Sequence, residues 1–96
     1  MDVLVAYDVQ TTDTKGQRRL RKVALACQAY GQRVQNSVFE CTVNDTQFEQ
    51  LVHRLTSIID QDEDNLRIYH LREPKNRYIQ MFGKRPAYDL NAPLVV

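Results

Sequence analysis

The order of strand-type and helix-type segments constrains the fold of this chain most. Apolar residues recur at helical spacing around residues 20–27 and 48–59, and short β-rich runs lie before, between and after these two segments. This order favours an antiparallel sheet with both helices packed on one face, which is the ferredoxin-like βαββαβ pattern of the α+β class. A chain of 96 residues can support one domain with a thin two-layer core.

Local signals predict where the first strand and helix begin and end. Residues 3–9 are β-rich and are bounded by a polar loop. Thr14 and Gln17 have the spacing of a capping box, so we expect the first helix to begin there. Gly31 is the expected stop of this helix, because glycine accepts the backbone conformation that often ends helices.

The second half of the domain follows the same logic. Residues 33–43 are extended in character, and periodicity leaves open whether they form one strand or a hairpin. Thr46 and Glu49 form a second capping-box pattern, and the apolar stripe behind them predicts a helix that ends near Asp60. Residues 66–71 form the last predicted strand of the core.

The C-terminal part of the chain is predicted to lie outside the core. We place the ferredoxin-like core at residues 1–72 and an extension at residues 73–96. The extension ends in the apolar run 93–96, although the core is complete without it. An apolar segment of this kind commonly pairs with a sheet edge, so we expect a terminal strand on the edge of this sheet or of another subunit's.

Asp8 is the candidate metal ligand. It ends the first predicted strand, and alternation places it on the same face as Leu4 and Ala6. Hard cations such as Mg²⁺ take oxygen ligands and often use only one or two protein carboxylates beside substrate phosphates. One carboxylate does not build a nuclease site, but a twofold axis through the site would supply a second Asp8.

Basic residues form a stripe on the first predicted helix. The formal net charge is only +1, so attraction to nucleic acid has to come from local clustering. No acidic residue occurs between Lys15 and Arg33, whereas solvated helix faces usually mix both signs. The stripe is therefore a candidate phosphate-binding surface, made of Lys15, Arg18, Arg19 and Lys22 with Arg21 beside it.

The remaining chemistry-bearing residues are expected to be structural. The two cysteines lack the spacing of a zinc site, the two histidines lie in no metal-binding motif, and the acidic run is expected to be a solvated turn. No apolar run approaches the roughly 18 residues that span a bilayer, so we expect no membrane partner and a cytoplasmic location. These residues are Cys27, Cys41, His53, His70, Asp60, Asp62 and Asp64.

Two motifs at a fixed separation resemble the CRISPR-associated protein 2 family. They are Val5-Ala6-Tyr7-Asp8-Val9 and the block from Tyr30 to Cys41, with Arg33-Val34-Gln35 and Ser37-Val38-Phe39-Glu40 as its most specific parts. The basic helix lies between them, and the resemblance covers nearly the whole chain. It implies a ferredoxin-like homodimer in which residues 31–43 form a hairpin and a strand within residues 92–96 adds to the partner's sheet.

The resemblance also implies an activity and partners. In similar proteins the acid matching Asp8 comes from both subunits and faces its mate across the dimer axis, where Mg²⁺ can bind. Family members have been assigned metal-dependent endonuclease activity on single-stranded RNA or double-stranded DNA, and others are inactive. They partner an integrase subunit and hold the DNA fragment inserted into a CRISPR array. Positions matching Arg33 and Phe39 are implicated in activity in the family, and Arg33 is also implied to contact nucleic acid. The basic residues of the helix do not align one by one with the family, so the resemblance implies nucleic-acid binding for them only as a group.

Three alternatives to this endonuclease remain open at the level of sequence. A non-catalytic dimer could bridge integrase subunits and bind duplex DNA, or the chain could be a related ribonuclease toxin of the same fold. A small-ligand regulatory domain is compatible with the fold but leaves the basic stripe unexplained. An RNA-recognition module is disfavoured, because the chain has no aromatic run of the type that such modules use.

Overall fold

The computed structural model describes residues 1–84. The terminal strand predicted within residues 92–96 lies outside this described part. The boundary predicted after residue 72 stays a prediction. The elements follow the order β1 (Asp2–Asp8), α1 (Thr14–Gln28), β2 (Gly31–Gln35), β3 (Val38–Thr42), α2 (Asp45–Ile58), β4 (Asn65–Leu71) and α3 (Lys75–Tyr78).

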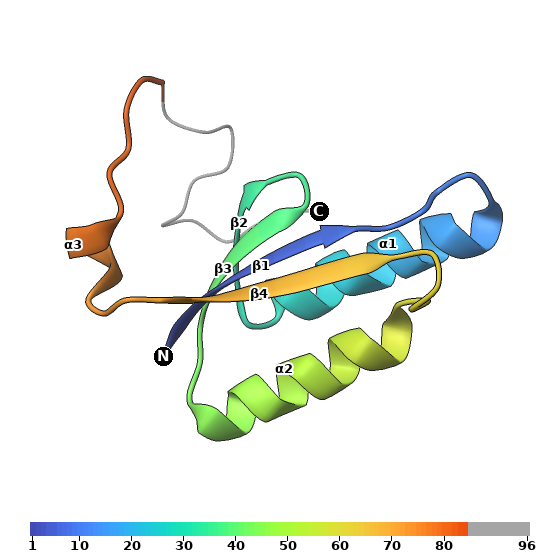
Figure 1. Ribbon diagram of the computed structural model, residues 1–96, viewed down its shortest axis with the longest axis horizontal. Helices are drawn as coiled ribbons and strands as arrows, with labels where there is room; N and C mark the ends of the chain where they lie inside the picture. Colours follow the sequence, from blue (N-terminus) through green and yellow to red (C-terminus); the bar gives the residue numbers. More distant parts are fainter. Residues whose placement is uncertain (85–96) are drawn as a thin grey trace.

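The sheet has four strands in the order β2-β3-β1-β4, and every neighbouring pair is antiparallel. Figure 1 shows α1 and α2 together on one side of this sheet. The predicted α+β ferredoxin-like fold is therefore confirmed. The question that periodicity left open is also settled, because β2 and β3 form a hairpin that turns at Asn36 and Ser37.

The central strand β1 divides the molecule into a covered and an open face. Val3, Val5 and Tyr7 point toward the helices and are buried, whereas Leu4 and Ala6 are only partly buried on the other side. Strand alternation produces this division, since successive side chains point to opposite faces. The core consists of Val3, Val5, Tyr7, Val9, Val23, Ala26, Cys27, Phe39, Cys41, Val43, Leu51 and Leu55.

Both capping predictions were wrong by one or two residues. The N-cap of α1 is Asp13, whose carboxylate accepts a hydrogen bond from the Gly16 N–H at 2.7 Å. The capping box of α2 pairs Asn44 with Gln47 through two reciprocal bonds of 2.8 and 3.0 Å. Asp and Asn are at least as good N-caps as threonine, so two adjacent candidates competed and the earlier residue capped each helix.

Gly31 does not end α1, which stops at Gln28 with Ala29 as its C-cap. It is the first residue of β2, where a Cβ would collide with the Glu40 carbonyl and with Cys41 on β3. Glycine is needed here because the backbones of the two strands come close together.

Candidate functional site

Asp8 is the last residue of β1 and its side chain is exposed. Its neighbour on β4 is Asn65, and the alternation of β1 places Asp8 on the open face with Ala6. Within residues 1–84 the Asp8 carboxylate forms no hydrogen bond or ion pair. The predicted position is therefore confirmed, and the carboxylate is available to an external cation.

The surface around Asp8 is partly apolar. Leu4, Ala6, Val38 and Leu71 are half-buried, and Tyr69 on β4 is 46% exposed. The antiparallel register brings these side chains to the same face as Asp8. The helices α1 and α2 pack on the other face, and Lys75 of α3 reaches this face only near the start of β1, 3.9 Å from Asp2 Oδ1 and from Glu40 Oε2.

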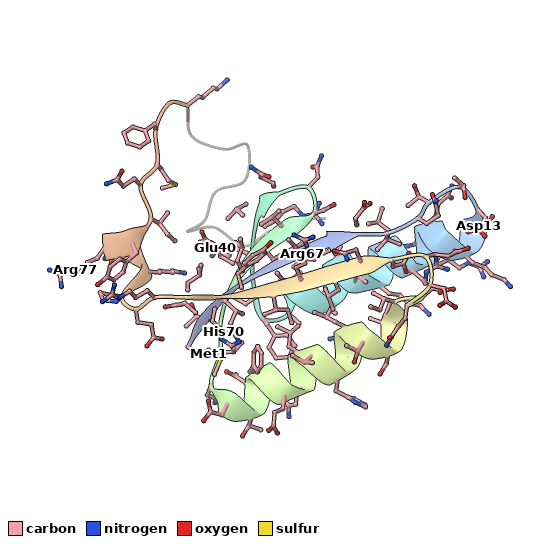
Figure 2. All side chains as sticks on the ribbon, viewed as in Figure 1. Met1, Asp13, Glu40, Arg67, His70 and Arg77 are labelled. Atoms are coloured by element: carbon pink, nitrogen blue, oxygen red, sulfur yellow. The ribbon has the colours of Figure 1, made fainter. Side chains whose placement is uncertain are left out.

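Arg67 is a charged residue of the open face that the sequence did not reveal. It lies opposite Ala6 and donates from Nη1 to the Tyr69 hydroxyl at 3.3 Å, which raises the pKa of Arg67. Figure 2 shows Arg67 and His70 leaving β4 on opposite sides, with His70 toward α2. Alternation along residues 65–71 shows that Arg67 and Tyr69 share one face of their strand. Only the register of β4 on β1, which pairs Arg67 with Ala6, shows that this is the face of Asp8.

A single protomer offers few ligands for a metal. Among residues 1–84, no three His, Cys, Asp or Glu side chains lie together in a way that could hold a metal ion. Asp8 supplies oxygen atoms that suit a hard cation, but it is one carboxylate. A Mg²⁺ site at Asp8 therefore fits these residues only if another chain or the substrate provides further oxygen ligands.

Arg33 and Phe39 lie together on the covered side of the sheet, away from Asp8. They are cross-strand neighbours, and the Arg33 guanidinium carbon lies 5.1 Å from the centre of the Phe39 ring. Phe39 is fully buried, and its ring stacks near Tyr7 with the ring centres 6.3 Å apart. Phe39 thus has no exposed surface for a substrate, and in the described residues its direct effect is on packing and on the position of Arg33.

A hollow of about 420 Å³ lies between α1 and the β2–β3 hairpin. Of the described residues that line it, only Arg21 and Arg33 are charged, and Leu20, Ala24 and Leu25 supply apolar surface. The structure thus brings two of the predicted nucleic-acid-binding residues, from distant parts of the sequence, to one concave surface.

Arg19 does not belong to the free basic surface. Its Nε lies 2.8 Å from Asp64 Oδ2 and its Nη2 lies 3.3 Å from Glu63 Oε2. The hydrogen bond to Asp64 raises the pKa of Arg19. The prediction that the five helix residues contact phosphates stays a prediction, but Arg19 is already paired with two acids, which helical spacing does not reveal because a distant turn brings them alongside.

The other four residues of the stripe face different surroundings. Arg21 faces the hollow beside the hairpin, and Lys22 faces a second hollow next to α2. Lys15 and Arg18 are exposed. The stripe is thus a broad cationic surface over the outer side of α1 and not a single line of contacts.

Asp64 corrects the prediction of a solvated acidic turn. Its side chain has no exposed surface and accepts hydrogen bonds from Arg19, from the Gln10 N–H at 3.0 Å and from the Asp60 N–H at 2.8 Å. Burial alone would raise the pKa of Asp64, but these hydrogen bonds and the Arg19 charge outweigh it and hold the pKa below its usual range. Asp64 is therefore a structural anion.

The cysteines are confirmed as core residues. Cys27 and Cys41 are buried and not disulfide-bonded, and burial raises the pKa of these thiols to about 12 and about 11. Both thiols are neutral near pH 7 and are poor nucleophiles. His70 packs against Phe48 with the ring centres 5.1 Å apart, and His53 is exposed on α2. Within residues 1–84, every helix is too short or too polar to cross a membrane.

The fold and these sites define a class of protein: a small ferredoxin-like domain with an exposed carboxylate at the end of its central strand, on the open face, and a cationic surface on the helix side. The family model described as CRISPR associated protein Cas2 matches residues 1–79. The chain belongs to this family, as its two sequence motifs indicated. This match favours the CRISPR interpretation over the ribonuclease toxin of the same fold.

Known proteins similar to this chain agree with the family match. CRISPR-associated endoribonuclease Cas2 1 of Moorella thermoacetica is 56% identical over 96 residues, which is all of both chains. The crystal structure of Streptococcus pyogenes Cas2 at pH 6.5 covers 86% of this chain and all of its own, with a TM-score of 0.77 and 51% identity. A chain of a partial Cas6-RT-Cas1–Cas2 complex covers 99% of this chain and 98% of its own, with a TM-score of 0.67 and 28% identity. The predicted class, a CRISPR-associated endonuclease-like protein of spacer acquisition, is confirmed at the level of the family.

Proposed function

We propose that this protein is the endonuclease-type subunit of a CRISPR spacer-acquisition complex, and that it works as a homodimer with a Mg²⁺ site shared between two Asp8 carboxylates. The observation that carries the proposal is the position of Asp8. Its carboxylate is exposed at the end of the central strand, on the face opposite α1 and α2, and within residues 1–84 it has no polar partner.

The open face supports the homodimer. It carries the half-buried Leu4, Ala6 and Val38 together with the exposed Tyr69, and a contiguous apolar surface of this kind commonly marks an interface. A twofold axis near the end of β1 would bring the two Asp8 carboxylates together. It would also bury these apolar side chains against their copies.

Asp8 suits magnesium, and the proposal gives this protein's residues defined roles. Bound Mg²⁺ would lower the pKa of a water molecule and stabilise negative charge on the scissile phosphate. The two Asp8 carboxylates would hold the cation and neutralise part of its charge. Without a cation, two facing carboxylates would repel each other, and a bound cation would relieve this repulsion.

The proposed substrate and partners follow the relatives. The Moorella relative is named an endoribonuclease, and Cas1 is present in the solved complex that contains a similar chain. We propose RNA or double-stranded DNA as the substrate and the Cas1-type integrase as the partner. The unpaired cysteines are as expected for a reducing compartment, so the cytoplasm is the proposed location.

The test compares wild type with Asp8→Asn in the cleavage of labelled RNA and duplex DNA in the presence of Mg²⁺. Loss of the charge should abolish cleavage and leave the dimer intact, because Asp8 makes no contact that holds the described chain together. Asp62→Asn is the matched control, since it removes one exposed carboxylate from the turn after α2. Cleavage that survives in the Asp8→Asn dimer would refute the catalytic role.

A second candidate function is favoured by the separation of charge between the two sides of the sheet. Arg21 and Lys22 border hollows beside α1, whereas Asp8 lies on the open face of the sheet. In one protomer the cations therefore do not surround the Asp8 carboxylate. A dimer that binds duplex DNA through α1 and bridges integrase subunits needs no cleavage.

The two candidates predict different behaviour of two sets of variants. If the protein is architectural, Asp8→Asn should leave spacer acquisition unchanged, and joint substitution of Lys15, Arg18 and Arg21 by glutamine should weaken duplex binding. Each lost phosphate contact should flatten the dependence of log K on log salt by about 0.9. Loss of acquisition in a folded, DNA-binding Asp8→Asn dimer would exclude a purely architectural role.

A further inference from the structure

The groove between the two long helices has a volume of about 450 Å³. Within residues 1–84, its lining contains cationic side chains and no acidic one. Helix α1 contributes Lys22 and Leu25. Helix α2 contributes His53, Arg54, Ser57 and Ile58.

Lys22 and Arg54 have no acid to neutralise them in the described part of the chain. Neither side chain forms an ion pair or a hydrogen bond with any of residues 1–84. Arg19, one turn before Lys22, has two acidic partners. Cations that face one groove without an intervening acid repel each other, and an external anion would relieve this repulsion.

The groove adjoins the hollow beside the hairpin, because the 45% exposed Leu25 lines both. Arg21 and Arg33 line the hollow, and Lys22 and Arg54 line the groove. Cations from α1, α2 and β2 therefore line two neighbouring hollows that share one exposed leucine.

We propose that the α1–α2 groove binds the backbone phosphates of a nucleic acid, with Arg54 and Lys22 as the contacting cations. The inference rests on the proposed nucleic-acid binding and extends it from α1 to α2. Arg54 is the new residue: it lies on the second helix, outside the basic stripe. The nucleic acid would pass over Leu25, which lines both hollows, and contact cations of each.

The distribution of charge favours a nucleic acid over an acidic protein segment. The cations are on three separate elements and in two adjoining hollows, which suits an extended polyanion with charge at regular intervals. Lys22, His53 and Arg54 are exposed, so their flexible side chains can reach phosphates without a change in the backbone.

The experiment measures binding of the full chain to a fluorescein-labelled DNA duplex over a range of salt concentrations. Arg54→Gln and Lys22→Gln should each weaken binding and flatten the slope of log K against log salt by up to about 0.9, and the double variant by up to about twice as much. Arg54→Lys keeps the charge and should keep the slope. Arg77→Gln, on α3 beyond the end of β4, is the control with the same change in charge (Figure 2).

Each outcome decides a separate point. An unchanged slope in folded Arg54→Gln and in the double variant would overturn the groove, and the Lys15, Arg18 and Arg21 variants would still test the proposed function. If Arg54→Gln weakens binding to the Cas1-type integrase but not to DNA, the groove takes an acidic protein segment and the inference is wrong. If the wild-type dimer does not bind the duplex at all, both the inference and the proposed nucleic-acid binding fail.

Discussion

At the scale of single residues, Asp64 connects three parts of the chain. Its carboxylate binds Arg19 of α1, the Gln10 N–H after β1 and the Asp60 N–H of the turn after α2. It has no exposed surface, so its charge is stabilised by these hydrogen bonds and not by water. The Arg19–Asp64 ion pair therefore fixes the N-terminal half of α1 against the turn that precedes β4.

The lowered pKa of Asp64 predicts a specific loss of stability in acid. A carboxylate whose folded pKa lies below its ordinary value of 3.8 contributes stability that is complete above that value and declines as the pH falls through the folded pKa. Asp64→Asn should lower the midpoint of thermal unfolding by several degrees at neutral pH. Below the ordinary pKa of 3.8, the midpoint of the variant should fall less steeply with decreasing pH than that of the wild type. Parallel pH profiles for wild type and Asp64→Asn would contradict this, and Asp62→Asn serves as the exposed control.

Phe39 also needs a test that separates packing from chemistry. It is fully buried against Tyr7 and beneath the Arg33 guanidinium, so Phe39→Ala should cost about 3–5 kcal/mol of unfolding free energy. Phe39→Leu keeps most of the volume and should retain both the fold and any cleavage activity. A Phe39→Ala variant of wild-type stability without activity would instead assign Phe39 a direct role.

At the scale of elements, Gly16 sets how closely α1 approaches the loop after β1. It is buried in the first turn of α1, and a Cβ at this position would collide with the Gln10 carbonyl oxygen. The Asp13 cap lies on the same turn and binds the Gly16 N–H. The N-terminus of α1 is therefore held by a hydrogen bond and by the absence of a side chain.

Gly16→Ala consequently tests which of two opposing effects on stability is larger, the higher helix propensity of alanine or the loss of close packing at Gln10. Alanine in a helix is favoured over glycine by about 1 kcal/mol, but the clash with Gln10 should make the variant less stable by about 1–3 kcal/mol. Denaturant unfolding measures the sign directly, with Thr14→Ala as an exposed control in the same turn. A more stable Gly16→Ala protein would show that the loop moves aside without cost.

The elements themselves were predictable because they depend on local periodicity. The apolar stripes of the helices and the alternation in β1 fixed the fold class and placed Asp8 on the face of Leu4 and Ala6. Cap positions were less predictable, since Asp13 competes with Thr14 and Asn44 with Thr46. Contacts between distant elements were not predictable at all: the Arg19–Asp64 pair depends on how α1 and the turn pack, which no spacing in the sequence encodes.

The candidate site likewise contains residues that local pattern identifies and residues that only contacts between distant elements identify. Asp8 and the cations of α1 became candidates from position and charge alone, whereas Arg54 did not, because its neighbours within one turn of α2 are neutral. Arg54 becomes a candidate only because the packing of α1 and α2 brings it and Lys22 to one groove. Arg67 was missed because the register of β4 on β1 brings it to the open face.

At the scale of the whole molecule, the sheet separates two kinds of surface. The open face carries Asp8, Arg67, a partly exposed apolar strip and the ion pairs of Lys75 with Asp2 and Glu40, and the helix side carries the cations of the two hollows that Leu25 lines. A homodimer formed through the open faces would enclose Asp8 near its axis and leave the cationic surfaces outside. Binding and cleavage would then be separable functions of one dimer.

The most direct test of the shared Asp8 site is a subunit-mixing experiment with wild-type and Asp8→Asn chains. When the two are mixed in equal amounts and exchanged to equilibrium, which mass measurement of tagged dimers verifies, about a quarter of the dimers keep both carboxylates. If both are required, cleavage in Mg²⁺ falls to about a quarter of the wild-type rate at the same dimer concentration. A rate of about half would mean that each Asp8 acts alone and would contradict the shared site.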